Sequence, residues 1–135
     1  MAIHRYQDFD AWKLASAFKT CVFDLVLHKC LGPLDLRFRA QLIEAARSVT
    51  SNFAEGFLKY SPCEFSRYLG ISVGSLGETE NHVRDGIALG HFRASDCEAF
   101  FRMGRRTLVA LVHLRRSQQK RCKEIRDKPR KKADK

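Results

Sequence analysis

The sequence predicts an all-α protein, an up-down-up-down antiparallel four-helix bundle. Apolar residues recur at steps of three and four through four long segments, which is the pattern of helices with one buried face. Short stretches containing Gly or Pro separate these segments, so consecutive helices are expected to be antiparallel neighbours. No segment shows a convincing strand pattern.

N-capping residues and helix-breaking residues set the predicted boundaries of the first two helices. Asp8 and Asp35 are candidate N-caps, and Leu31-Gly32-Pro33 ends the first helix because it forbids simple continuation. Residues 1–120 are expected to form one bundle domain, followed by a basic and largely mobile tail over residues 121–135. The four helices are predicted over residues 8–29, 35–56, 62–89 and 95–120.

Two capping boxes mark the starts of the third and fourth helices. The stretch SPCE at residues 61–64 offers a capping serine, a proline at the first helical position and a glutamate that can close the box. The pattern S-x-x-E at residues 95–98 repeats the box before the fourth helix. Pro129 should stop the basic tail from being helical throughout.

Two further stripes lie away from the predicted core and are candidates for an oligomer interface. The first helix carries a second apolar stripe, which either an N-terminal arm or a subunit interface would cover. The third helix carries a glycine stripe, which would let another helix approach closely; a locally weak helix without a partner is the alternative. The two stripes consist of Phe9, Trp12, Phe23 and Leu27, and of Gly70, Gly74 and Gly77.

The charge is concentrated at one end of the chain. The net charge is +10, and residues 101–135 hold 14 basic and 3 acidic residues. Residues 1–100 therefore carry a net charge of −1. Such asymmetry favours a polyanion partner, RNA or DNA ahead of an anionic membrane.

Cysteine usage and hydropathy indicate a cytoplasmic protein. The five cysteines are an odd number without a C-x-x-C pair, which suits unpaired thiols in a reducing compartment. No apolar run approaches the roughly 20 residues that span a bilayer, and the first residues lack the apolar core of a secretory signal. No membrane association is expected.

The acidic residues beside the core do not form an enzyme motif. A di-metal site in a bundle needs Glu-x-x-His pairs, and the spacing from Glu78 to His82 is one residue too long. Glu55 and Glu80 are better explained by pairing with an arginine or with backbone donors. No nucleophile elbow, His-Glu-x-x-His motif or phosphate loop is present. The sequence therefore predicts no enzyme, no catalytic residue, no metal and no cofactor.

Three stretches resemble a known protein family. QLIEAARSVTSNFAEGF (residues 41–57) and EFSRYLGISVGSLGETE (residues 64–80) resemble the second- and third-helix motifs of the four-helix-bundle proteins encoded in intervening sequences of bacterial 23S rRNA genes. The opening YQDFDAWKLA is also similar, so the resemblance covers roughly residues 6–115. The motif positions, to which only a structural role is carried over, are Asn52, Glu55, Gly56, Gly74, Ser75, Glu78 and Glu80.

This resemblance implies an assembly and a set of partners. The family is related to the accessory proteins of diversity-generating retroelements, which are pentameric and engage nucleic acid and a reverse transcriptase. The resemblance therefore implies a homopentameric ring that binds RNA or DNA, with a reverse transcriptase or another protein as a further partner. It implies no enzymatic activity.

The fourth helix carries the candidate nucleic-acid interface. Cationic residues recur there at spacings of one or two turns, so they could follow a phosphate backbone. There are two alternatives. The basic residues could form a solvated face that binds no partner, or the protein could be a protein-interaction scaffold without nucleic-acid contact. The candidate contact residues are Arg102, Arg105, Arg106, His113, Arg116, Lys120, Arg121 and Lys123.

Overall fold

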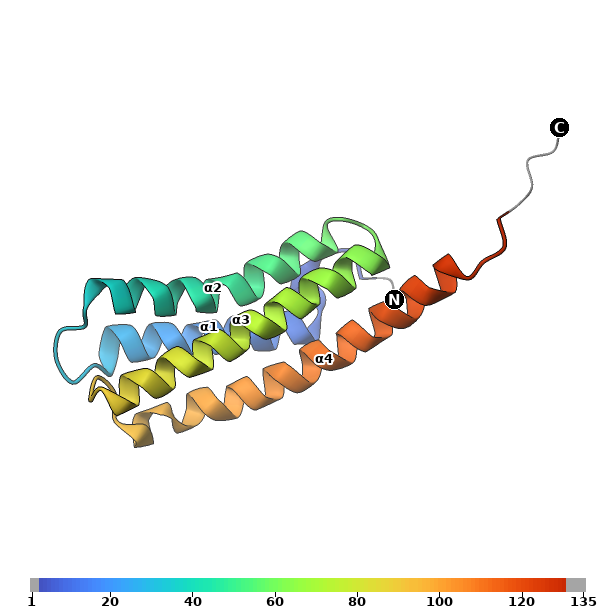
Figure 1. Ribbon diagram of the computed structural model, residues 1–135. Helices are drawn as coiled ribbons and strands as arrows, with labels where there is room; N and C mark the ends of the chain where they lie inside the picture. Colours follow the sequence, from blue (N-terminus) through green and yellow to red (C-terminus); the bar gives the residue numbers. More distant parts are fainter. Residues whose placement is uncertain (1–2, 131–135) are drawn as a thin grey trace.

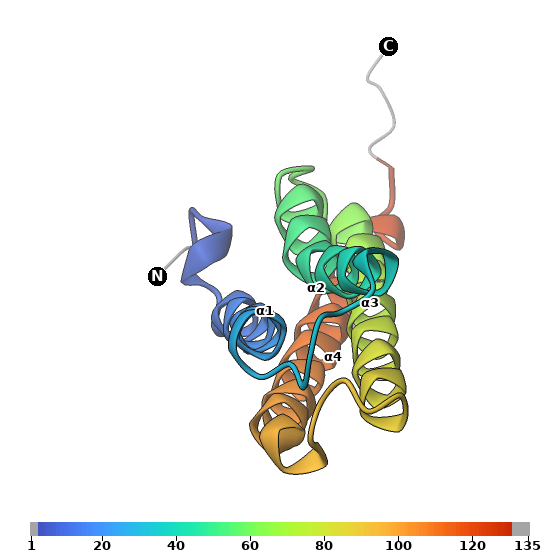
Figure 2. The same cartoon turned by 90° about the vertical axis from the view of Figure 1, so that its left-hand side faces the viewer.

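Four long α-helices account for most of residues 3–130, the part of the chain that this computed structural model describes (Figure 1). Each helix packs against its neighbours in sequence, and α1 also packs against α4. Seen from one end, the helices surround a shared interior (Figure 2). This arrangement confirms the all-α class and matches an up-down bundle. The elements are η1 (Tyr6–Asp8), α1 (Asp10–His28), α2 (Leu36–Phe57), α3 (Pro62–Ala88), η2 (Ala94–Cys97) and α4 (Glu98–Arg126).

Two of the four predicted N-caps are confirmed. The Asp35 carboxylate accepts a hydrogen bond from the Phe38 amide at 3.0 Å, and the Ser61 hydroxyl accepts one from the Glu64 amide. The prediction for Asp8 is wrong, because this residue lies in η1 and Phe9 precedes α1. The capping box at residues 95–98 is also wrong, because α4 continues directly from the 3-10 turn η2 without a side-chain cap.

The fourth helix runs six residues beyond its predicted end. It ends at Arg126, three residues before Pro129. Its last turns project past the rest of the bundle (Figure 1). Part of the stretch expected to be a mobile tail is therefore helical, and residues 131–135 lie outside the described part of the chain.

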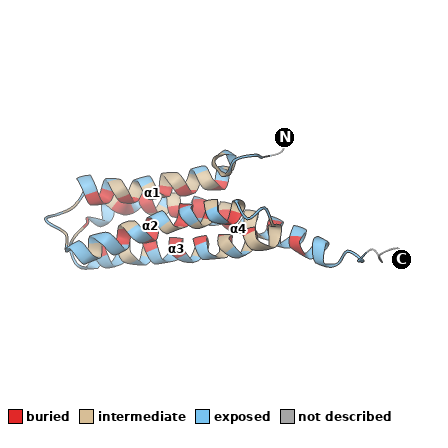
Figure 3. Ribbon diagram, turned by 90° about the horizontal axis from the view of Figure 1, so that it is seen from above, coloured by how far each residue is buried: buried red, intermediate tan, exposed pale blue. Residues whose placement is uncertain are grey.

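The core lies along the axis between the four helices, and the buried residues of each helix follow one stripe (Figure 3). Phe18 of α1 and Phe100 of α4 stack in its middle, with ring centroids 4.8 Å apart. Leu108 of α4 lies outside this buried stripe and is exposed. The largest fully buried side chains are Phe18, Phe53, Phe92, Phe100, Leu25, Leu42, Leu69, Leu76, Leu111, Val22, Val49 and Val83.

The N-terminal arm closes one end of the bundle with an aromatic cluster. The Phe9 ring lies 5.5–5.7 Å from the rings of Phe53, Phe57 and Phe65, mostly edge to face. The Tyr6 ring lies 5.6 Å from the Trp12 ring. Edge-to-face aromatic pairs stabilise beyond the area they bury. The arm therefore covers the first half of the second apolar stripe of α1 from within the same chain.

One disulfide contradicts the prediction of unpaired thiols. It joins Cys63 at the start of α3 to Cys122 near the end of α4, with Cα atoms 4.8 Å apart. The two residues are 59 positions apart in sequence, so only the packing of α3 against α4 brings them together. Cys21, Cys30 and Cys97 are free. Burial raises the pKa of the Cys97 thiol to about 11, assisted by Asp96.

Over the described residues, none of the helices combines the length and apolar character required to cross a bilayer.

Candidate nucleic-acid interface

The basic face of α4 is solvent-accessible along its whole length. It runs from Arg102 to Lys123, about 32 Å along the helix axis at 1.5 Å per residue. All eight predicted contact residues are exposed: Arg102, Arg105, Arg106, His113, Arg116, Lys120, Arg121 and Lys123.

Seven of these eight residues share one side of the helix. At 3.6 residues per turn they fall within an arc of about 100°, centred near Arg102 and Lys120. Arg121 lies about 100° away from Lys120 and therefore faces a different direction. Val109, which is 67% exposed, lies within the same arc and interrupts the cationic row.

Two carboxylates of α4, Glu98 and Glu124, lie in the same arc, but within residues 3–130 neither forms an ion pair with this face. The ion pairs found in residues 3–130 join Arg5 to Asp8, Arg67 to Glu64, His82 to Glu78 and Arg84 to Glu80, and none includes one of the eight residues. Apart from Arg105, whose charge also acts on Glu80, these side chains are therefore free to pair with an external anion. Cationic side chains that are not paired internally are those that can exchange small counterions for phosphates.

Arg105 also acts on a half-buried acid behind the face. Burial raises the pKa of the Glu80 carboxyl, and the positive charges of Arg84 and Arg105 partly offset this effect. The Glu80 and Arg84 side chains approach to 4.0 Å. Arg84 in turn lies over the Phe101 ring, 4.5 Å from its centroid. Glu80 is thus held between α3 and α4 by packing and nearby arginines.

The other motif residues of α2 and α3 join these two helices. The Asn52 amide donates to the Ser48 carbonyl and hydroxyl, and the Ser48 hydroxyl lies 2.9 Å from that of Ser75. The Tyr68 hydroxyl donates to Glu55 at 3.2 Å. These bonds satisfy polar groups beside the core, as such groups require.

Gly56 and Glu78 complete the motif. A side chain on Gly56 would overlap the Cβ of Tyr68, so glycine allows α3 to pack against α2 at this point. Glu78 lies 3.3 Å from the His82 ring nitrogen on the surface of α3. No group of three or more His, Cys, Asp or Glu side chains with the geometry of a metal site occurs within the described chain.

The residues of the predicted glycine stripe have different surroundings. Gly70 is covered by Arg115, whose guanidinium carbon would lie 3.0 Å from an added Cβ. Gly74 and Gly77 are exposed, with nothing within 4 Å of an added Cβ. The close approach at Gly70 is therefore made by a side chain of the same protomer, while Gly74 and Gly77 remain open to a second one. Of the second apolar stripe of α1, Phe23 is half-buried and Leu27 is exposed.

Sequence reasoning missed the structural role of Arg115. Its Nε donates to the Ser66 carbonyl at 3.3 Å, so it bridges α4 to α3. In the sequence Arg115 cannot be told apart from the adjacent Arg116, because the difference between these two arginines depends on the packing of α3 against α4.

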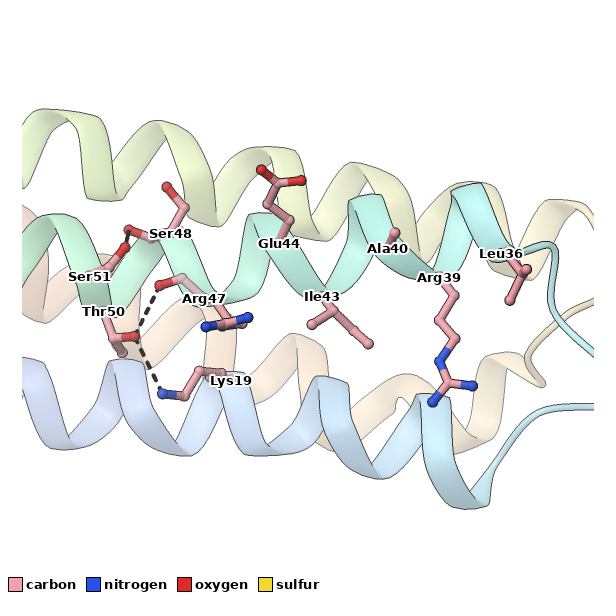
Figure 4. A pocket seen from close by; sticks show the side chains of 10 residues that line it. All are labelled: Lys19, Leu36, Arg39, Ala40, Ile43, Glu44, Arg47, Ser48, Thr50 and Ser51. Atoms are coloured by element: carbon pink, nitrogen blue, oxygen red, sulfur yellow. Dashed lines mark hydrogen bonds between the residues drawn. The ribbon is translucent and has the colours of Figure 1, made fainter.

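Sequence reasoning also missed a second basic surface, a groove between α1 and α2 (Figure 4). Lys19 of α1 and Arg39 and Arg47 of α2 lie in it, whereas Glu44 points away toward α3 (Figure 4). Lys19 donates to the Thr50 hydroxyl at 3.4 Å. The spacing of eight residues between Arg39 and Arg47 places both on one face of α2, but nothing in the sequence pairs them with Lys19.

A comparison with known proteins identifies one family. The sequence model of the family described as 23S rRNA-intervening sequence protein matches residues 7–111. The match includes α1, α2, α3, the first half of α4 and all of the motif residues above. The basic residues from His113 onward lie beyond it. No curated protein matches the chain at a significant level.

Proposed function

The chain belongs to the 23S rRNA-intervening sequence protein family, and from that premise we propose that it is a non-enzymatic bundle protein that binds RNA or DNA through the basic face of α4. The observation that carries this proposal is the row of six exposed arginines and lysines, with His113 among them, within one arc, none of them paired with a carboxylate in residues 3–130.

The chemistry of the face favours backbone contact over sequence reading. Arginine guanidinium groups grip phosphate with two parallel donors, and lysine adds a point charge. Contacts to phosphates fix position and supply affinity, but they carry no sequence information. The expected mode is therefore salt-sensitive binding with little dependence on base sequence.

Self-assembly would strengthen this binding. In a homopentameric ring each subunit would repeat the basic face, so several weak contacts to one nucleic acid would combine into a stronger one. A protein partner, such as a reverse transcriptase, would then bind the assembly at a separate surface. The second candidate function is a scaffold that binds only such a protein partner.

The test compares two variants with equal loss of charge. One neutralises three residues of the α4 face (R102Q/R106Q/R116Q), and the other neutralises the three cations of the α1–α2 groove (K19Q/R39Q/R47Q). Binding of a generic single-stranded RNA and a generic duplex DNA is measured by fluorescence anisotropy across a salt series. Circular dichroism checks that both variants keep the wild-type helix content.

The α4 variant should bind weakly. Its slope of log K against log salt should be smaller in magnitude by about 2–3, because each lost phosphate contact reduces that slope by about one. The groove variant should keep most of the wild-type affinity and slope. Equal losses in both variants would show that net charge, not the α4 face, determines binding. Absence of binding to either nucleic acid at low salt would overturn the proposal and favour the scaffold.

A further inference from the structure

The disulfide holds the part of α4 that reaches beyond the bundle. Cys63 is the second residue of α3, and Cys122 lies in the last turns of α4. Between residues 119 and 130, Cys122 is the only buried residue, and it is 7% exposed. Figures 1 and 3 show these turns projecting past the start of α3 with an exposed surface. The disulfide is therefore the one buried link that fixes them.

The surroundings of the disulfide suit thiol chemistry. A cleft of about 620 Å³ opens beside the two cysteines. Glu64 in the cleft is paired with Arg67 at 3.0 Å, so three cations and one carboxylate remain in its lining, and one of these cations, Arg115, donates to the Ser66 carbonyl. Cations beside a sulfur stabilise the thiolate that thiol–disulfide exchange requires. The charged residues lining the cleft are Glu64, Arg67, Arg115, Lys123, Arg126 and Asp127.

We propose that Cys63 and Cys122 form a reversible redox site that reacts with a low-molecular-weight thiol of the glutathione class. The thiolate of the small molecule attacks the sulfur of Cys63, a half-buried residue that lines the cleft, and the bond to Cys122 breaks. Cys122 leaves as a thiolate and takes up a proton. A second small thiol then attacks the small-molecule sulfur of the mixed disulfide and releases Cys63.

The small thiol is the reductant in this reaction. One protein disulfide and two small thiols give two cysteine thiols and one small-molecule disulfide. The protein gains two electrons and two protons, and the small thiols lose them. The reverse reaction, with the small-molecule disulfide as oxidant, closes the bond again.

The consequence for binding rests on the proposed function. Lys120, Arg121 and Lys123 flank Cys122 on the turns that the disulfide fixes. After reduction these turns have no other buried side chain to hold them, so they fray and their cations must be ordered again when a polyanion binds. Ordering each side chain has a cost, and the expected loss is about threefold to tenfold in affinity.

The redox site is tested without nucleic acid. The full chain is equilibrated in buffers with different ratios of reduced to oxidised glutathione, and free thiols are alkylated and located by peptide mass spectrometry. Cys63 and Cys122 should change from disulfide to thiol together across the series, while Cys21, Cys30 and Cys97 stay thiols. A pair that stays open in oxidised glutathione alone, or closed in reduced glutathione alone, overturns the proposal.

The effect on α4 is tested by comparing the oxidised and reduced chain. Amide hydrogen exchange over residues 118–126 should become at least about tenfold faster on reduction, since opening of frayed turns has a low free energy. Cys63→Ser should match the reduced form under all conditions, whereas Cys21→Ser should respond like the wild type. Unchanged exchange on reduction would show that the disulfide does not hold these turns.

RNA affinity of the same two forms separates this proposal from the proposed function. Tighter binding by the oxidised form supports both. Equal binding by the two forms overturns the redox control and leaves the function intact. If neither form binds, the proposed function fails, and the glutathione series and hydrogen exchange still decide the redox site.

Discussion

Gly56 is the residue at which the missing side chain matters most for the packing of α2 against α3. An added Cβ there would overlap the Cβ of Tyr68 and lie 3.3 Å from the Phe65 ring. The same contact brings the Tyr68 hydroxyl to Glu55. Gly56 therefore acts in helix packing, although a glycine and a glutamate beside core phenylalanines also fit the pattern of a functional cluster.

Substitution of this glycine should destabilise the protein. Gly56→Ala forces Tyr68 or the helix backbone to move, which should lower the free energy of unfolding by about 1–3 kcal/mol. Gly74→Ala is the matched control when both variants are measured at a protein concentration at which the chain is monomeric, because Gly74 is exposed with open space around it in the single chain. In that helix position alanine should raise the free energy of unfolding by about 0.5–1 kcal/mol. Urea denaturation measures both, and a change of the same sign in the two variants would contradict this account.

Glu80 should make stability depend on pH. Burial raises the pKa of its carboxyl in the folded chain above the usual value of 4.5, so the folded state binds more protons than the unfolded state between the two pKa values. The contribution of Glu80 to stability should therefore fall as pH rises from 4.5 through the raised pKa, and then level off. Glu80→Gln removes this effect.

Urea denaturation of the wild type and Glu80→Gln at several pH values from 4 to 7 checks this expectation. The variant should gain stability relative to the wild type as pH rises through that window. A difference that stays constant would show that Glu80 has the same pKa in both states. The close contact between Glu80 and Gly104, where an added Cβ would lie 2.8 Å from a carboxylate oxygen, explains why this carboxyl is partly desolvated.

At the scale of helices, the sequence was enough to predict the helix starts that are capped by a side chain at that point in the chain. Asp35 and Ser61 cap α2 and α3 with their own side chains, so the sequence around them was sufficient. The disulfide near the end of α4 could not be predicted in this way, because Cys122 meets Cys63 only after α3 and α4 pack together. Closing a loop of this length stabilises a fold by about 4 kcal/mol in the chain-entropy view, so the missed disulfide is a large term.

The candidate interface could also be predicted where it depends on one helix, but not where it depends on the packing of two helices. The basic row on α4 follows from helical periodicity within one segment, and all eight predicted residues are exposed, although Arg121 faces away from the other seven. The α1–α2 groove needs Lys19 beside Arg39 and Arg47, which requires knowing that the two helices lie side by side. The distinction between Arg115 and Arg116 also depends on a neighbouring helix, since Arg115 covers Gly70 of α3.

At the scale of the whole molecule, exposed leucines gather at the end of the bundle opposite the aromatic cluster. The end of α1, the start of α2 and the end of α3 meet there (Figure 1). Large apolar side chains that remain exposed together are typical of an interaction surface. The residues concerned are Leu27, Leu31, Leu36 and Leu89.

This distribution bears on the proposed homo-oligomer. Phe9 and Trp12 of the second apolar stripe are covered by their own chain, so the remaining candidates on α1 are Phe23 and Leu27. On α3 the remaining candidates are Gly74 and Gly77. If subunits meet through the exposed end of α1, a charge placed there should prevent assembly without affecting the fold.

We expect the full chain to sediment as an oligomer at micromolar concentration and Leu27→Glu to sediment as a monomer. Leu27 is 61% exposed, so burying a carboxylate there in an interface would be costly, whereas the monomer could leave it in solvent. Leu58→Glu is the matched control, because Leu58 is 51% exposed at the opposite end of α2. Analytical ultracentrifugation decides between the outcomes. A wild-type chain that is only monomeric would exclude self-association, and dissociation of Leu58→Glu instead of Leu27→Glu would place the interface at the aromatic end.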